Sequence, residues 1–172
     1  MASNPNPTRI SAAMWRFWTE FKAFEKGAQY GGTFAPKPGY HSYRSRLSSS
    51  DYSVGEVAND RQGSAEKCSA IDITLSAANM VKYSKRLDAA MKAKDKRLYI
   101  GGQPILREYI GTIDNKTVRC YMLTGGKAQG VGADSGVDYG RDKSHLWHIH
   151  LSFIRKFCEA WDAFERVLGS RR

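Results

Sequence analysis

The ten residues from Ser144 to Phe153 constrain the fold of this chain more than any other stretch. They contain three of the four histidines in the sequence. Apolar side chains (Trp147, Ile149, Leu151, Phe153) alternate here with polar ones (His148, His150, Ser152). A period of two predicts a strand with one apolar and one polar face, because successive strand side chains point to opposite faces. His148 and His150 would then project together and could share a metal ion or divide the roles of ligand and proton carrier; the alternative is a half-exposed strand that happens to carry histidine.

A second strand of the same kind is predicted at residues 70–75. Ile71, Ile73 and Leu75 alternate there with Ala70, Asp72 and Thr74. A carboxylate in mid-strand needs a partner, either a metal, a cation or several hydrogen-bond donors. An Asp with one or two histidines is a common donor set for an open zinc site, whereas the structural alternative is a hydrogen bond to a loop or a salt bridge. We expect Asp72 and His150 to meet across adjacent strands in one pocket.

Helical periodicity predicts three helices around this sheet. One should span about residues 11–26, with five large apolar groups on one side that face the core or a partner. Another should begin near Ser76, and the last should span roughly 156–168. Further strand segments fall between residues 97 and 124, with a hairpin turn at Asp114-Asn115-Lys116. The predicted fold class is α+β: a small antiparallel sheet that carries the candidate metal site, flanked by three helices.

Three segments lack any apolar periodicity and are predicted to be loops. Residues 27–40 are rich in Gly and Pro, and residues 48–69 in Ser, Gly and charge. The glycine-rich segment 125–140 is either a mobile lid beside the histidine strand or a surface loop without a function of its own. His41 follows the first loop and is the one histidine outside the late strand. A lone loop histidine is more often a surface or packing residue, so its value depends on what it folds against.

Composition limits the partners and the compartment. The net charge is 27 − 17 = +10, which favours an anionic partner such as nucleic acid, anionic lipid or the acidic polymers of a bacterial wall. Three widely spaced cysteines without a C-x-x-C motif predict free, buried thiols. No signal peptide and no membrane-spanning run is visible. We therefore expect synthesis in a cytoplasm and no membrane partner.

Two sequence elements resemble a known superfamily. Ala70-Ile71-Asp72-Ile73 and Trp147-His148-Ile149-His150 are similar to the A-x-D-[IV] and W-H-x-H elements of the zinc D-alanyl-D-alanine carboxypeptidases and L-alanyl-D-glutamate endolysins, a group related to lysostaphin-type and hedgehog-like domains. The segment Gly39–Arg44 resembles the one that precedes the first element. The likeness covers roughly residues 39–155 through motif order, and the chain as a whole is similar to actinobacterial-phage proteins of this peptidase-like group.

The resemblance implies a zinc site and also shows departures. The usual first ligand histidine would fall at Ala65, and the glutamate of the carboxypeptidase branch at Trp147. The implied ligands are therefore His41, Asp72 and His150, with His41 supplying the missing donor. His148 would be the catalytic residue, and Arg44 and Trp147 would bind substrate. Glu56, Glu66 or Glu108 could reach the site from a loop, although no sequence feature selects one.

Two functions follow from the resemblance and stay open at this point. The first is a zinc peptidase that cuts peptidoglycan stem peptides at the bacterial wall. The second is a structural virion component, in a phage tail or capsid, that kept the fold and lost the metal site. The corresponding organisation is an N-terminal arm and aromatic helix at 1–38 and a peptidase-like domain at 39–172. Nucleic-acid binding rests on charge alone, so we do not expect that partner.

Overall fold

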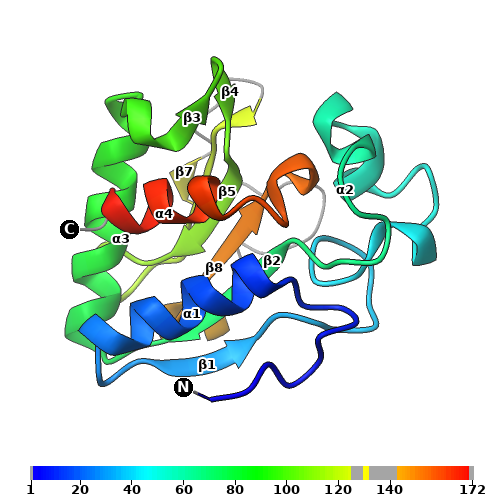
Figure 1. The fold of residues 1–172 in the computed structure, drawn as a ribbon. Coiled ribbons are helices and arrows are strands. Elements are labelled where there is room, and N and C mark those ends of the chain that lie inside the picture. Colours follow the sequence, from blue (N-terminus) through cyan, green and yellow to red (C-terminus); the bar gives the residue numbers. More distant parts are fainter. Residues whose placement is uncertain (1, 125–129, 132–142, 171–172) are drawn as a thin grey trace.

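The computed structural model of the chain describes residues 2–124, 130–131 and 143–170, and its centre is a six-stranded sheet (Figure 1). The strand order is β1-β2-β8-β5-β6-β7, and every neighbouring pair is antiparallel. The strands are β1 (Gln29–Gly32), β2 (Ala70–Thr74), β5 (Leu106–Gly111), β6 (Arg119–Met122), β7 (Gly130–Val131) and β8 (His148–Phe153). A separate two-stranded hairpin joins β3 (Tyr99–Ile100) to β4 (Gln103–Pro104). The late histidine strand β8 therefore lies between β2 and β5 in the middle of the sheet.

Three longer helices and several short ones accompany the sheet, which makes the fold α+β as predicted. The helices are α1 (Ala12–Phe24), α2 (Tyr52–Gly55), α3 (Ala77–Lys92) and α4 (Trp161–Gly169), with 3₁₀ turns at Arg44–Arg46, Ala58–Arg61, Lys96–Leu98, Lys143–Leu146 and Arg155–Phe157. Ser11 and Ser76 cap the N-termini of α1 and α3 by accepting hydrogen bonds from backbone N–H groups. Both helices therefore begin where the sequence predicts.

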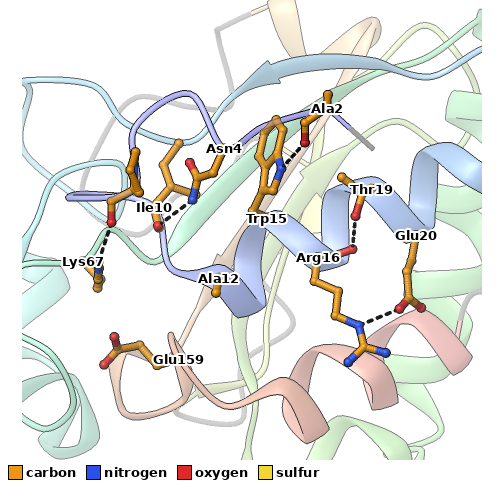
Figure 2. Close-up of a pocket in the computed structure, with 11 residues that line it drawn as sticks. Ala2, Asn4, Ile10, Ala12, Trp15, Arg16, Thr19, Glu20, Lys67 and Glu159 are labelled. Atoms are coloured by element: carbon orange, nitrogen blue, oxygen red, sulfur yellow. Dashed lines mark hydrogen bonds and ion pairs between the residues drawn. The ribbon is translucent and has the colours of Figure 1, made fainter.

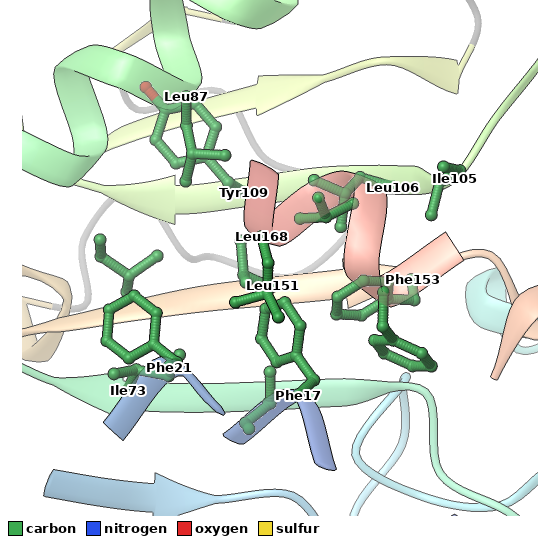
Figure 3. Close-up of a cluster of buried hydrophobic side chains, with 14 of the residues drawn as sticks. Phe17, Phe21, Ile73, Leu87, Ile105, Leu106, Tyr109, Leu151, Phe153 and Leu168 are labelled. Atoms are coloured by element: carbon green, nitrogen blue, oxygen red, sulfur yellow. The ribbon is translucent and has the colours of Figure 1, made fainter. Parts of the chain in front are cut away.

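One face of the sheet is buried against α1, α3 and α4. Alternate strand residues such as Ile73, Leu151 and Phe153 share a single hydrophobic cluster with side chains of all three helices (Figure 3). The aromatic stripe of α1 forms a large part of it, because Met14, Phe17, Trp18 and Phe21 are buried. The core-facing interpretation of this helix is thus confirmed, and residues on both sides of position 38 build the same core.

Phe17 lies at the centre of this cluster, and its removal should be costly. The ring is fully buried and packs against Phe153 and Phe164 at centroid distances of 5.5 and 5.6 Å. We expect Phe17→Ala to lower the free energy of unfolding by about 3–5 kcal/mol, because it removes buried area and leaves a cavity. Urea unfolding measures this change, with Phe24→Ala as control, since Phe24 is 38% exposed and should cost far less. Equal losses in the two variants would contradict the packing described here.

The opposite face of the sheet is polar at its centre. The strand alternation that buries Ile149 and Leu151 under the helices turns His148, His150 and Ser152 to this other side. Asp72 on β2 faces the same way, since it is the register partner of His150. The predicted common face of the two histidines and the predicted meeting of Asp72 with His150 are both confirmed.

Two predicted boundaries were wrong. The segment 27–40 is not entirely loop, because β1 pairs with the edge of β2 despite its glycines. Gly31 permits this close approach, since a Cβ atom there would lie 2.9 Å from Cβ of Asp72. The last helix begins at Trp161 instead of about residue 156, because Arg155–Phe157 forms a 3₁₀ turn directly after β8. Apart from β7, the glycine-rich segment with its possible lid lies outside the described residues.

Other local predictions agree with the structure. The turn at Asp114–Lys116 joins β5 to β6, and the Asp114 carboxylate accepts hydrogen bonds from the N–H groups of Lys116 and Thr117 at 2.9 Å. Cys68, Cys120 and Cys158 are free and buried. Among the described helices, none combines the length and the apolar character needed to cross a bilayer.

Candidate metal centre

All four histidines of the chain line one small cavity on the polar face of the sheet. His41, His145, His148 and His150 surround a space of about 110 Å³, together with Asp72 and the side chains of Lys37, Tyr40 and Tyr52. Asp72 and His150 come from β2 and β8, His145 from the 3₁₀ turn before β8, and His41 from the irregular segment after β1. The cavity thus joins chain segments more than a hundred residues apart.

His41 is oriented by the backbone of the segment that follows β1. Its Nδ1 lies 2.8 Å from the carbonyl oxygen of Thr33. A carbonyl can only accept, so Nδ1 carries the hydrogen and donates it. In the neutral ring Nε2 is then an acceptor, and it points at Asp72 Oδ2 (3.2 Å) and His150 Nδ1 (3.1 Å). This is the tautomer in which metal-binding histidines are commonly held by a second, outer partner.

His150 is oriented by a hydrogen-bonded relay within the sheet. The Ser152 hydroxyl donates to Glu108 Oε1 at 3.2 Å, and it lies 2.8 Å from His150 Nε2. A hydroxyl that donates to the carboxylate accepts from the ring, so Nε2 carries the hydrogen of His150. Nδ1 is left as an acceptor, 2.9 Å from Asp72 Oδ1. Ser152 and Glu108 are fully buried, which holds the relay in one geometry.

Three acceptor atoms therefore converge where a positive charge is required. His41 Nε2, His150 Nδ1 and the Asp72 carboxylate cannot satisfy one another without a cation or an added proton between them. In the metal-free chain such an added proton would lie on the imidazoles. Burial opposes ionisation of Asp72, but the positive charge of a protonated His41 and a hydrogen bond from His150 outweigh it, and they hold the pKa of this carboxyl well below its usual value. Asp72 is therefore a carboxylate, which is the form that binds metal.

The geometry of these three groups suits a metal ion. Their ligand atoms all lie within 4.8 Å of one another. The pairwise distances of 2.9–3.2 Å given above are close to the roughly 3.3 Å that separates ligand atoms around a tetrahedral zinc ion with bonds of about 2.0 Å. Two imidazoles and a carboxylate also form a donor set typical of open zinc sites. The group His41, Asp72 and His150 can hold a metal ion.

The relay behind His150 leads to a prediction on metal affinity. Ser152→Ala should weaken zinc binding by about 10- to 100-fold, because it releases the ring from its outer partner. Calorimetric titration of the metal-free chain with zinc measures the change. Ser69→Ala is the matched control, since Ser69 is equally buried but donates to the carbonyl of Phe153 at 2.8 Å instead of serving a ligand. Unchanged affinity in Ser152→Ala would show that the relay does not support the site.

His148 lies beside the three candidate ligands without joining them. Its Nε2 is 3.9 Å from Asp72 Oδ1, and its ring lies 4.5 Å from that of His145. His148 is also the register partner of Thr74, at the end of β2, and its side chain is more exposed than that of His150 (15% against 5%). The arrangement places a second imidazole pair next to the group that can bind metal.

The structure leaves two of the expected site residues outside the cavity. Arg44 lies in a 3₁₀ turn, where its guanidinium donates to the carbonyl of Gly63 at 3.0 Å. Trp147 is 54% exposed and does not line the cavity. The positions of these two residues therefore do not support the substrate-binding roles expected for them. A residue close to a histidine in sequence need not point into the same cavity as that histidine.

None of the three glutamates considered from sequence lines the cavity either. Glu56 pairs with Arg107, Glu66 pairs with Arg9, and Glu108 acts behind His150 through Ser152. Sequence reasoning did not assign roles to His145, Lys37, Tyr52 or Ser152. His145 had one available signal, since it stands three residues before His148 in the same histidine-rich stretch.

A larger hollow of about 760 Å³ lies elsewhere, between the N-terminal arm and α1 (Figure 2). Its polar groups are already engaged within the chain: Arg16 bonds Glu20, the Trp15 indole donates to the carbonyl of Ala2, and Lys67 donates to Pro7. Among the residues that the structure describes, those lining this hollow do not form a group of candidate metal ligands. The candidate metal ligands therefore line the smaller cavity, not the larger one.

Comparisons of the chain with protein-family models, with curated proteins and with solved structures found no match.

Proposed function

We propose that the protein is a zinc-dependent peptidase of phage origin that hydrolyses the stem peptides of peptidoglycan. The observation that carries the proposal is the convergence of His41, Asp72 and His150 in a cavity that also contains two further histidines. A protein that retained only the fold has no need to keep two buried imidazoles and a half-buried carboxylate with their acceptor atoms facing one another, because such an arrangement costs stability without a cation or an added proton.

The position of His41 supports a functional site over a degenerate one. Alanine stands at position 65, where the resembling enzymes carry their first ligand, and a methyl group cannot bind metal. In the structure Ala65 instead accepts a backbone hydrogen bond from Ser45 at 2.9 Å. His41 reaches the same donor group from an upstream segment, so the set of three ligands is complete without a histidine at position 65.

The chemistry follows from the groups around the cavity. Zinc, when bound, supplies a Lewis acid that activates water toward a peptide carbonyl. His148 stands beside the ligands with its ring toward the cavity, so it is placed to accept a proton and to return it to the leaving amine. His145 contacts His148 and orients it. Lys37 lines the cavity and offers a positive charge for an anionic part of the substrate.

The overall charge agrees with an acidic polymer as substrate. A net charge of +10 attracts the chain to an anionic wall and raises the local enzyme concentration there. This attraction weakens with ionic strength, so association with purified walls should fall as salt rises.

Metal removal and return test the proposal directly. The purified chain should contain zinc, should release small peptides from peptidoglycan, should lose this activity after chelation, and should regain it when zinc is restored. Mass spectrometry of the released fragments identifies the bond that is cut. A chain that binds no zinc at micromolar concentrations, or that binds it without hydrolysing wall peptides, would contradict the proposal. In the second case, stoichiometric recovery of the chain in purified virions would favour the structural alternative.

A further inference from the structure

Arg155 is a fully buried charged residue near the cavity, and the chemistry described above does not use it. It follows β8 by two residues, and none of its surface is exposed. A buried guanidinium is costly unless its N–H groups are all engaged. Its partners therefore show what the fold gains by keeping it.

The partners of Arg155 are the two ends of the turn that carries His41. Its terminal nitrogens donate to the carbonyl of Ser42 at 3.0 Å and to the carbonyl of Gly39 at 3.2 Å. Gly39 and Ser42 are themselves joined by a backbone hydrogen bond of 3.0 Å, which closes a turn around His41. Two further hydrogen bonds go to Ser53, at its carbonyl (2.8 Å) and its hydroxyl (2.9 Å). One planar group thus spans both ends of the turn.

A second connection ties the residue before His41 to the same arginine. The Tyr40 hydroxyl donates to Asp60, whose other oxygen accepts the backbone N–H of Arg155 at 2.8 Å. The Arg155 guanidinium also lies over the Tyr40 ring, 5.2 Å from its centroid. Burial, together with the negative charge of Asp60, raises the pKa of Tyr40 well above its usual value, so the phenol remains a donor.

We propose that Arg155 is a positioning residue for the metal centre, which holds the turn of His41 at a fixed place relative to the strand that carries His150. This inference rests on the proposed metal site. Because His150 lies on the strand that leads into Arg155, one short segment of chain supplies a ligand and also fixes the loop that supplies another. His41 otherwise sits in an irregular segment that follows the glycine-containing strand β1.

The physical consequence is preorganisation. A metal binds tightly only to the fraction of molecules in which all ligands are in place, and the apparent dissociation constant rises in inverse proportion to that fraction. We call the hydrogen bonds from Arg155 to Gly39 and Ser42 the arginine clamp. Without this clamp, the turn of His41 would sample other conformations, and metal binding would have to order it. Lysine keeps the charge at position 155 but lacks the planar fork, so it cannot hold two carbonyls at once.

Arg155→Lys tests the proposal in the full-length chain, with Arg119→Lys as the matched control. Arg119 is also largely buried, but it pairs with Asp88 of α3 on the helix-covered side of the sheet. We expect zinc affinity, measured by calorimetry on folded metal-free protein, to fall at least about tenfold in Arg155→Lys and to stay at the parental value in Arg119→Lys. Parental affinity in Arg155→Lys, or an equal loss in the control, would overturn the proposal.

Hydrogen exchange of the metal-free protein supplies a readout that is independent of zinc. The N–H groups of Ala35 and Ser42 bond the carbonyls of His41 and Gly39, so they report on the turn. They should exchange faster in Arg155→Lys, while the amides of β2 and β5 keep their parental protection. If the parental chain binds no zinc, the proposed function fails. Hydrogen exchange then tests by itself whether Arg155 holds the turn of His41. If Ala35 and Ser42 exchange at the parental rate in Arg155→Lys, the proposal that Arg155 positions this turn is overturned.

A milder variant covers the case in which Arg155→Lys does not fold. Ser53→Ala removes one hydroxyl acceptor of the guanidinium and leaves the arginine in place. It should weaken zinc binding by about threefold, as expected for the loss of one hydrogen bond in the supporting network. Parental zinc affinity in this variant would then overturn the proposal.

Discussion

Alanine in place of His150 is expected to lower zinc affinity by roughly 10²- to 10³-fold. The binding free energy of a four-ligand zinc site is about 10–16 kcal/mol, so each ligand contributes on average about 2.5–4 kcal/mol. His150 has a larger share than a surface ligand would, because its Nδ1 faces both Asp72 and His41 and its ring is held from behind by Ser152. Loss of zinc should abolish hydrolysis of wall peptides in the same variant.

The comparison with His41→Ala makes this experiment decisive for the unusual ligand. Calorimetric titration should give a similar loss for His41→Ala, because both nitrogens approach Asp72 at about 3 Å. His148→Ala is the internal control and should bind zinc like the parental chain. If His41→Ala binds zinc normally while His150→Ala does not, His41 is a packing residue and the third ligand lies elsewhere.

The second large effect is expected for His148→Ala, in hydrolysis instead of in binding. Removal of a general acid–base group typically costs 10²- to 10⁴-fold in rate, and we expect a loss in this range at unchanged zinc content. The reason is position: His148 lines the cavity, yet its Nε2 stands 3.9 Å from Asp72, farther than the nitrogens of His41 and His150.

The variant His148→Gln tests whether His148 transfers a proton or only fills space and forms hydrogen bonds. Glutamine keeps a polar side chain that can donate and accept hydrogen bonds, but it cannot carry a proton between groups. It should therefore be nearly as inactive as the alanine variant when release of wall peptides is measured. Substantial activity in His148→Gln would show that this position only orients the substrate or stabilises developing charge.

Sequence periodicity was sufficient for the elements that build the polar face. The alternation at 70–75 and 147–153 predicted β2 and β8, and it placed Asp72, His148 and His150 on one side. Side-chain direction in a strand follows from local geometry alone, so a period of two can be recognised without tertiary information. The aromatic stripe of α1 and the start of α3 near Ser76 were also predictable, because helical periodicity is a local pattern too.

The errors concern segments whose structure depends on distant neighbours. The strand β1 forms because the edge of β2 supplies its backbone partners, which outweighs the low strand propensity of its glycines. The late start of α4 reflects the turn at Arg155, whose hydrogen bonds go to residues some hundred positions earlier. Composition carries no record of such contacts.

Local pattern therefore established an α+β chain with a carboxylate and two imidazoles on one sheet face. Only the tertiary structure decided that His41 joins them, that Ser152 and Glu108 stand behind His150, and that Arg44 turns away from the cavity. The reason is physical: strand and helix periodicity encode which way a side chain points. The meeting of two remote segments instead depends on how all elements pack, and here that packing includes a buried arginine that joins the turn of His41 to the end of the histidine strand.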